Sequence, residues 1–84
     1  MKILIQTMQL IQRIDQLIHL QATGTPDQLA SRLGISRTKV YRIIKFMKDL
    51  DAPILYDLHS QNFIYAEAVG FRFGFYQNEL QSDE

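Results

Sequence analysis

Residues 28–42, QLASRLGISRTKVYR, determine how this chain folds. Their apolar side chains recur at helical spacing on both sides of Gly34, and glycine readily takes the positive φ that a tight turn between helices requires. Ala30 is small where two helices must approach closely, and Val40 is apolar where the angle between them must be filled. The stretch therefore predicts two helices packed against each other across a three-residue turn, residues 34–36.

Capping signals predict where both helices begin and end. Thr25 and Pro26 form a strong start, because threonine caps free N–H groups and proline is tolerated in the first turn. The first of the two helices is therefore expected over residues 26–33. Ser36 is the expected N-cap of the second, which covers residues 37–50 and ends before the next proline.

Regular patterns extend on both sides of this pair. Residues 3–22 predict one long helix with an unusually wide apolar stripe, and Gly24 is its expected C-cap. Downstream, the β-forming runs 54–57 and 63–66 flank a polar turn at residues 59–62. This arrangement predicts an antiparallel β-hairpin.

The last part of the chain is less regular. Residues 71–76 alternate apolar and polar side chains again, and the run is either a further strand or an extended arm. Residues 77–84 are polar and acidic and are expected to fray. The predicted fold class is α+β: one mainly α domain over residues 1–76 with a small antiparallel hairpin.

Composition removes several classes of function. The 84 residues contain no cysteine, which excludes a disulfide scaffold, a thiolate zinc site and a cysteine nucleophile. His19 and His59 have no carboxylate at ligand spacing, and neither the serines nor the glycines form a catalytic or phosphate-binding motif. We therefore expect no enzyme, metal or other cofactor. No stretch suits a membrane span or a secretory signal, so a cytoplasmic protein is expected.

The charges are balanced in number but not in position. Nine Lys and Arg oppose nine Asp and Glu, so the net charge is zero. Residues 31–48 contain no acid and six bases, which are Arg32, Arg37, Lys39, Arg42, Lys45 and Lys48. The simple interpretation is a solvated helix face. The alternative is a basic surface for nucleic acid, which a neutral protein can still present.

The helix over residues 37–50 separates these bases from its apolar side. At about 100° per residue, Thr38, Arg42 and Lys45 lie opposite the expected core face, which is formed by Val40, Ile43, Ile44, Met47 and Leu50. A helix in the major groove of DNA reads base edges and holds phosphates with such polar and cationic residues. The candidate DNA contacts are Ser36, Arg37, Thr38, Lys39, Tyr41, Arg42 and Lys45, with Arg42 and Thr38 as base readers.

Together with the downstream residues 50–54, LDAPI, this run resembles the winged helix-turn-helix domain of DeoR-like and biotin-repressor-like bacterial transcriptional regulators. The resemblance covers about residues 10–66. It implies a three-helix core with a β-hairpin wing, and sequence-specific binding of double-stranded DNA in transcription regulation. Wings of this family often carry Lys or Arg, whereas the candidate contacts at this tip are His59, Gln61 and Asn62.

The sequence leaves two questions about partners open. The first nine residues extend the family's first helix with apolar side chains. These either pack on residues 71–76 of the same chain or join that aromatic strand in a homodimer contact. The alternative to DNA binding is a winged-helix module that binds protein, which the neutral hairpin tip and the apolar ends favour. The basic segment favours DNA.

Overall fold

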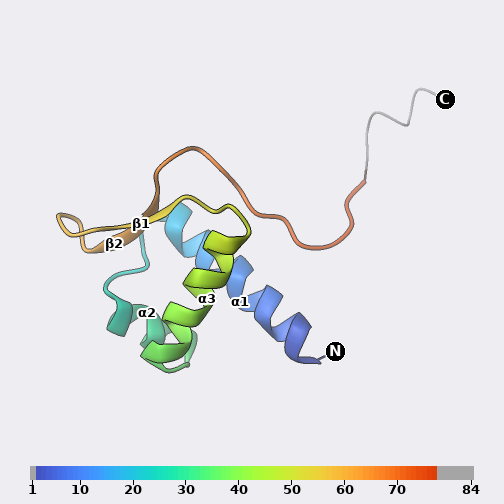
Figure 1. The fold of residues 1–84 in the computed structure, drawn as a ribbon, viewed down its shortest axis with the longest axis horizontal. Coiled ribbons are helices and arrows are strands. Elements are labelled where there is room, and N and C mark those ends of the chain that lie inside the picture. The colour runs from blue at the N-terminus through green and yellow to red at the C-terminus, as the bar shows by residue number, and fades with distance from the viewer. Residues whose placement is uncertain (1, 78–84) are drawn as a thin grey trace.

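The computed structural model of the chain describes residues 2–77. Three helices precede a two-stranded antiparallel sheet (Figure 1): α1 (Lys2–His19), α2 (Pro26–Leu33), α3 (Arg37–Asp49), β1 (Ile54–Asp57) and β2 (Asn62–Tyr65). The expected α+β class, mainly helical with a small hairpin, is confirmed. Residues 78–84, most of the stretch expected to fray, lie outside the described residues. In the part of the chain that is described, no helix has the length and apolarity to cross a membrane.

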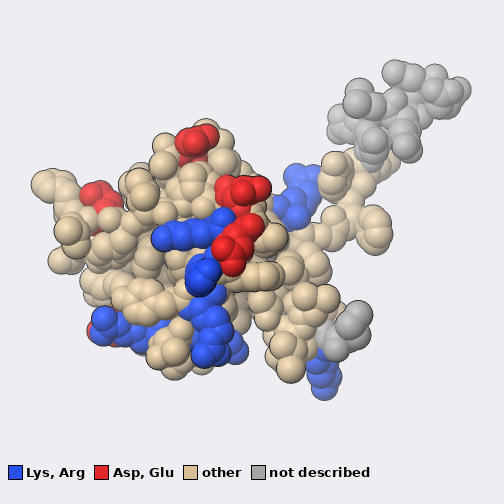
Figure 2. Space-filling model, in the orientation of Figure 1, with Lys and Arg blue, Asp and Glu red and all other residues tan. Residues whose placement is uncertain are grey.

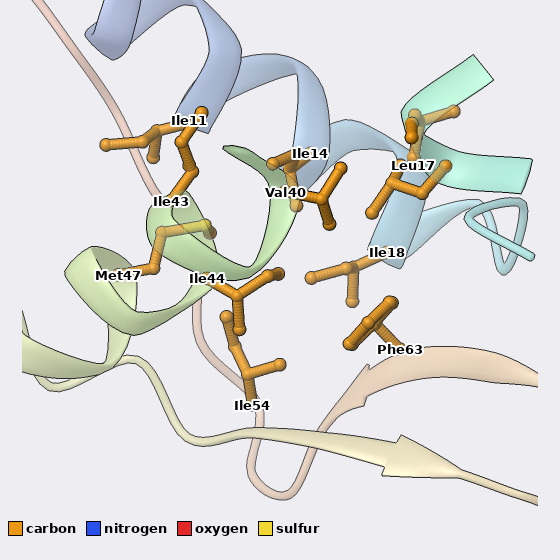
Figure 3. Packing of buried hydrophobic residues seen from close by; sticks show 12 residues of the cluster. Ile11, Ile14, Leu17, Ile18, Val40, Ile43, Ile44, Met47, Ile54 and Phe63 are labelled. Atoms are coloured by element: carbon orange, nitrogen blue, oxygen red, sulfur yellow. The ribbon is translucent and has the colours of Figure 1, made fainter. Parts of the chain in front are cut away.

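One apolar core joins the C-terminal half of α1 to the inner face of α3 and to the hairpin. Figure 3 shows Ile14 and Ile18 of α1 turned toward Val40 and Ile44 of α3, with Phe63 of β2 beside them. The buried apolar side chains are Ile11, Ile14, Leu17, Ile18, Leu29, Ala30, Val40, Ile43, Ile44, Met47, Ile54 and Phe63. Full burial of one large apolar side chain contributes about 1.5–3 kcal/mol. This core therefore fixes which face of α3 points outward.

The turn between α2 and α3 forms as its sequence predicts. Gly34 has φ +67° in the left-handed region, and its N–H donates to the carbonyl oxygens of Ala30 and Ser31. At the start of α2, Thr25 and Gln28 form a reciprocal capping box around Pro26. Because these caps satisfy free backbone groups locally, the expected bounds of α2 are confirmed.

The end of α1 differs from the prediction. The helix stops at His19, and the left-handed residue after it is Gln21, with φ +55°. The N–H of Ala22 donates to the carbonyl oxygen of Leu17 and closes the helix three residues early. Gly24 as C-cap is therefore wrong. Its φ of +72° serves the following loop instead.

A buried threonine attaches this loop to the hairpin. Thr23 is fully buried, and its hydroxyl oxygen accepts a hydrogen bond from the N–H of Phe63 at 2.8 Å. The N–H of Gly24 donates to Oδ1 of Asn62, also at 2.8 Å. A Cβ at Gly24 would collide with the side chain of Gln28, which explains why the chain has no side chain there. These bonds place α2, and with it α3, relative to the sheet.

A second polar contact connects α1 with β2. Asp15 is buried, and its Oδ1 accepts a hydrogen bond from the hydroxyl of Tyr65 at 2.7 Å. Burial, together with this carboxylate, raises the pKa of Tyr65 well above its ordinary value. Nε2 of His19 lies 3.3 Å from the same Oδ1. The expectation that no carboxylate stands at ligand spacing from His19 was wrong, because residues i and i+4 of a helix are neighbours.

The second strand of the hairpin is shifted by one residue from the prediction, whereas the first has the expected bounds. β2 begins at Asn62 rather than at residue 63, and the strand register places Asp57 opposite Asn62. In the turn, Oδ2 of Asp57 accepts from the hydroxyl of Ser60 at 2.8 Å and its Oδ1 from the N–H of His59 at 3.2 Å. These hydrogen bonds lower the pKa of Asp57, with the Ser60 bond as the largest cause.

Residues 71–76 form no strand in the structure. Phe71 packs partly against the core, whereas Phe73, Phe75 and Tyr76 are exposed. Figure 1 shows this run leaving the body of the molecule as an extended arm, which was the second of the two expected alternatives. Gly74 has φ +106°, and this conformation interrupts the straight backbone that a strand needs.

Candidate nucleic-acid interface

The outward face of α3 is mainly polar and basic. Thr38, Lys39, Arg42 and Lys45 are exposed, while the opposite face of the helix is buried in the core. Figure 2 shows Lys and Arg side chains gathered over α3 and acidic side chains beside its C-terminal end. Leu50 was expected on the core face, but α3 ends at Asp49 and Leu50 is exposed. Helical periodicity therefore predicts the buried and exposed faces of α3 correctly up to Asp49, where the helix ends.

Ser36 caps the N-terminus of α3. Its hydroxyl oxygen accepts a hydrogen bond from the N–H of Lys39 at 3.0 Å, so the side chain acts as the expected N-cap. The hydroxyl proton stays able to donate to an incoming oxygen. The N–H groups of Arg37 and Thr38, at the first two positions of the helix, have no carbonyl acceptor within it. This end of α3 therefore presents donors and a partial positive charge.

Arg37 and Tyr41 form a pair at the junction of α2 and α3. The guanidinium lies 3.5 Å from Oδ1 of Asp27, donates to the Tyr41 hydroxyl at 3.5 Å, and lies 5.7 Å from the centre of that ring. The Tyr41 contact, with help from Asp27, raises the pKa of Arg37 above its ordinary value. Like any arginine, Arg37 is a permanent cation. A phosphate can replace its exposed partner, Asp27.

The remaining cations of α3 differ in how free they are. Lys45 lies 3.7 Å from Asp49 one turn later, in a pair that is largely exposed and therefore weak. Among residues 2–77, neither Lys39 nor Arg42 forms an ion pair. Arg42 combines this freedom with a central position on the exposed face. Of these cations, Arg42 is the one best placed to enter a groove of a nucleic acid.

The hairpin tip offers less than expected. Asn62 faces inward, because its Oδ1 accepts from Gly24 and its Nδ2 donates to the carbonyl oxygen of Ser60. His59 and Gln61 are exposed, as candidate contacts must be. Asp57 lies beside them, and its lowered pKa favours the ionised carboxylate. The tip therefore presents one fixed negative charge and no Lys or Arg.

A groove beside α3 is the feature that sequence reasoning missed. It has a volume of about 720 Å³ and lies between the N-terminal half of α1 and the outer side of α3. Its lining consists of Ile3, Leu4, Thr7, Lys39, Arg42, Ile43, Lys45, Phe46 and Asp49. The available signal was the apolar stripe of α1, which continues to Ile3 beyond the part that the core covers. The divergence of α1 from α3 (Figure 1) could not be read from it.

The comparisons add no identity to this geometry. No protein-family model matches the chain, and neither the curated proteins nor the solved structures contain a match to it. Within residues 2–77, no group of three or more His, Cys, Asp or Glu residues is placed to hold a metal ion.

Proposed function

We propose that this chain is a winged helix-turn-helix domain that binds double-stranded DNA and acts in transcription regulation, with α3 in the major groove. The supporting observation is the face of α3, where Thr38, Lys39, Arg42 and Lys45 are exposed while the apolar side is buried. An α-helix with its side chains is about 10–12 Å across, and the major groove is about 12 Å wide. The hairpin of β1 and β2 corresponds to the wing.

The residues of α3 divide into two roles by position. Arg42 has no ion pair among the described residues and lies at the middle of the exposed face, where its fork can bind guanine O6 and N7. Thr38 lies one turn earlier on the same face. Lys39, Lys45 and the capping Ser36 flank these two and hold phosphates.

Arg37 and Tyr41 complete the phosphate contacts. Their mutual hydrogen bond and ring contact orient the guanidinium at the start of α3. Replacing the exposed Asp27 by a phosphate oxygen exchanges one anion for another, so the binding step costs little. From the hairpin we retain only His59 and Gln61, because the amide of Asn62 is already bonded.

The test is binding to random-sequence duplex DNA across a salt series. The variants are Arg37→Ala/Arg42→Ala/Lys45→Ala and the control Lys2→Ala/Arg13→Ala/Arg72→Ala, which removes the same charge outside residues 31–48. The slope of log K against log salt falls by about 0.9 for each phosphate that the protein no longer neutralises. We expect the α3 variant to reduce the slope by at least about 1.8, and the control by less than about 0.9.

A protein-binding module is the second candidate, and the apolar groove beside α3 favours it. The same experiment separates the two functions. If the folded wild type shows no salt-dependent binding at low ionic strength, the DNA proposal is wrong. Equal slopes for both triple variants would also remove α3 from the interface.

A homodimer would suit a two-fold symmetric DNA site, with half-sites about 34 Å apart. The structure supplies no C-terminal strand within residues 2–77 for the expected contact, so the proposal rests on α1. Ile5 is exposed, and it does not line the groove that Ile3 and Leu4 line. We place the dimer contact on this side of α1. Sedimentation of wild type against Ile5→Gln tests it, and a wild type that stays monomeric at high concentration overturns it.

A further inference from the structure

The groove between α1 and α3 has a composition that specifies its occupant. Ile3, Leu4 and Phe46 provide apolar walls, all three at least partly exposed to solvent. Lys39, Arg42 and Lys45 line the same groove and outnumber its one acid, Asp49. A fitting occupant therefore carries apolar side chains for the walls and carboxylates for the cations. With only α1 and α3 around it, the groove surface stays open to an occupant.

Charge argues against the simplest occupant, a second copy of α1. The first turn of α1 carries Lys2 and no acid, so it would bring positive charge to a basic groove. Residues 73–84 of this chain have the opposite character. Phe73, Phe75 and Tyr76 are exposed, and Glu79, Asp83 and Glu84 follow them in sequence. We call residues 73–84 the arm. The arm matches the groove in both apolar and charged groups.

The arm also starts at a position from which it can reach the groove. Phe71, together with Ile11 and Met47, lines a small cavity of about 200 Å³ at the other end of the α1–α3 seam. Leu4 lies seven residues before Ile11, which is about 10 Å along the helix. Four extended residues span about 13 Å, so Phe75 reaches the level of Leu4 from an anchored Phe71.

The same comparison of lengths shows that the acids of the arm can reach the cations of α3. Lys39 precedes Met47 by eight residues, or about 12 Å along α3. Glu79 follows Phe71 by eight residues, which span up to about 26 Å when extended. The arm can therefore run along the seam, antiparallel to α3, without moving Phe71.

We propose that residues 73–84 dock in the groove of their own chain, with Phe75 and Tyr76 on the apolar walls and the carboxylates opposite Lys39, Arg42 and Lys45. The described conformation, with Phe75 fully exposed, is then the open state. The docked arm covers residues that we assign to DNA contact, so arm and DNA compete. This consequence rests on the proposed function, whereas docking itself does not.

Docking is tested by disulfide trapping in the full chain, which has no cysteine of its own. Leu4→Cys/Phe75→Cys is compared with Leu58→Cys/Phe75→Cys, whose exposed partner lies at the hairpin tip. Loop closure favours the control, because its two positions are closer in sequence. We expect the Leu4 pair to form an intramolecular disulfide at least about tenfold faster than the control, since docking raises the local thiol concentration.

Three trapping results overturn the proposal or part of it. Equal rates for both pairs exclude docking in this groove. A disulfide-linked dimer as the main product of the Leu4 pair shows that the arm occupies a second copy, which contradicts docking within one chain. In denaturing urea we expect the Leu4 pair to lose its advantage, because docking needs the folded groove and loop closure then favours the control pair. A Leu4 pair that stays the faster one in the unfolded chain overturns the assignment.

Competition is measured by DNA binding with a change that leaves the charge unaltered. If the docked state outweighs the open state by about ten to one, Phe75→Ser raises DNA affinity about tenfold. Leu58→Ser removes an exposed apolar side chain from the hairpin and is expected to leave affinity unchanged. Equal affinities of Phe75→Ser and wild type overturn the competition. If no variant binds DNA but the Leu4 pair is still trapped quickly, the proposed function fails and docking stands.

Discussion

Thr23→Val tests whether a single buried hydroxyl holds the helical pair against the sheet. Valine has nearly the same shape as threonine, so the substitution leaves no cavity. It replaces the hydroxyl, which also donates to the carbonyl oxygen of Gly24 at 3.1 Å, by a methyl group. It removes the acceptor of the N–H of Phe63, which lies 2.8 Å from the Thr23 hydroxyl oxygen. Thr23 is fully buried and Phe63 is only 5% exposed, so water has no direct access to the unpaired N–H.

The cost follows from this geometry. An unsatisfied buried donor destabilises a protein by about 1–3 kcal/mol. A domain of this size has a total stability of about 4–13 kcal/mol, at roughly 0.05–0.15 kcal/mol per residue. We therefore expect Thr23→Val to lower the free energy of unfolding by about 1–3 kcal/mol and Tm by about 4–8 °C for each kcal/mol.

Urea unfolding followed by circular dichroism measures the change, with Thr7→Val as the matched control. Thr7 is half-buried on α1 and its hydroxyl forms no hydrogen bond within residues 2–77. We expect the control to change stability by less than about 0.5 kcal/mol. A Thr23→Val destabilisation no larger than that of the control would refute the reasoning, because it would mean that the Phe63 N–H finds another partner.

Three further predictions concern the binding face, the turn and the hairpin. Arg42→Ala should cost about 1–3 kcal/mol on a selected DNA site and relax its specificity, whereas Lys45→Ala should weaken all sequences alike; competition binding with mismatched sites distinguishes them. Gly34→Ala meets no atom within 4 Å but keeps φ +67°, so urea unfolding should show a destabilisation of about 1–2 kcal/mol from backbone strain alone. The pKa of Asp57 is lowered in the folded state, so its contribution to stability is present above the unfolded pKa and is lost as pH falls through the folded one. The drop in urea midpoint between about pH 6 and pH 3 should therefore be smaller for Ser60→Ala than for wild type, and an unchanged drop would contradict this role of the Ser60 bond.

Local signals determined which parts of the fold could be predicted. The bounds of α2 and the left-handed turn at Gly34 follow from residues within one or two helical turns, and the sequence contains all of them. The end of α1 could not be found this way, because the left-handed residue that follows it is Gln21, and glutamine does not mark a helix end as glycine does. The role of Gly24 could not be found either, since its N–H donates to Asn62, which is 38 residues away and was expected to face solvent. Long-range polar contacts of this kind have no periodic signature.

The candidate site shows the same division. Helical periodicity is sufficient to place Thr38, Arg42 and Lys45 on one face, because the core side of α3 is apolar without interruption. It cannot show that Arg37 lies within 3.5 Å of Asp27, since that distance depends on how α2 meets α3. The groove was missed for a related reason. Its existence depends on the angle at which α1 leaves α3, which no spacing in the sequence encodes.

The two halves of α1 explain how α3 can stay in place while access to its outer face changes. In the C-terminal half, the apolar stripe buries Ile11, Ile14 and Ile18 against the inner face of α3 and holds the helix in place. In the N-terminal half, the same stripe continues through Leu4 and Ile3 beside the outer face, where the core no longer covers it. An occupant of that groove contacts the cations that we assign to DNA without disturbing the buried side. Under the proposed function, access to the binding face can therefore change while the position of α3 does not.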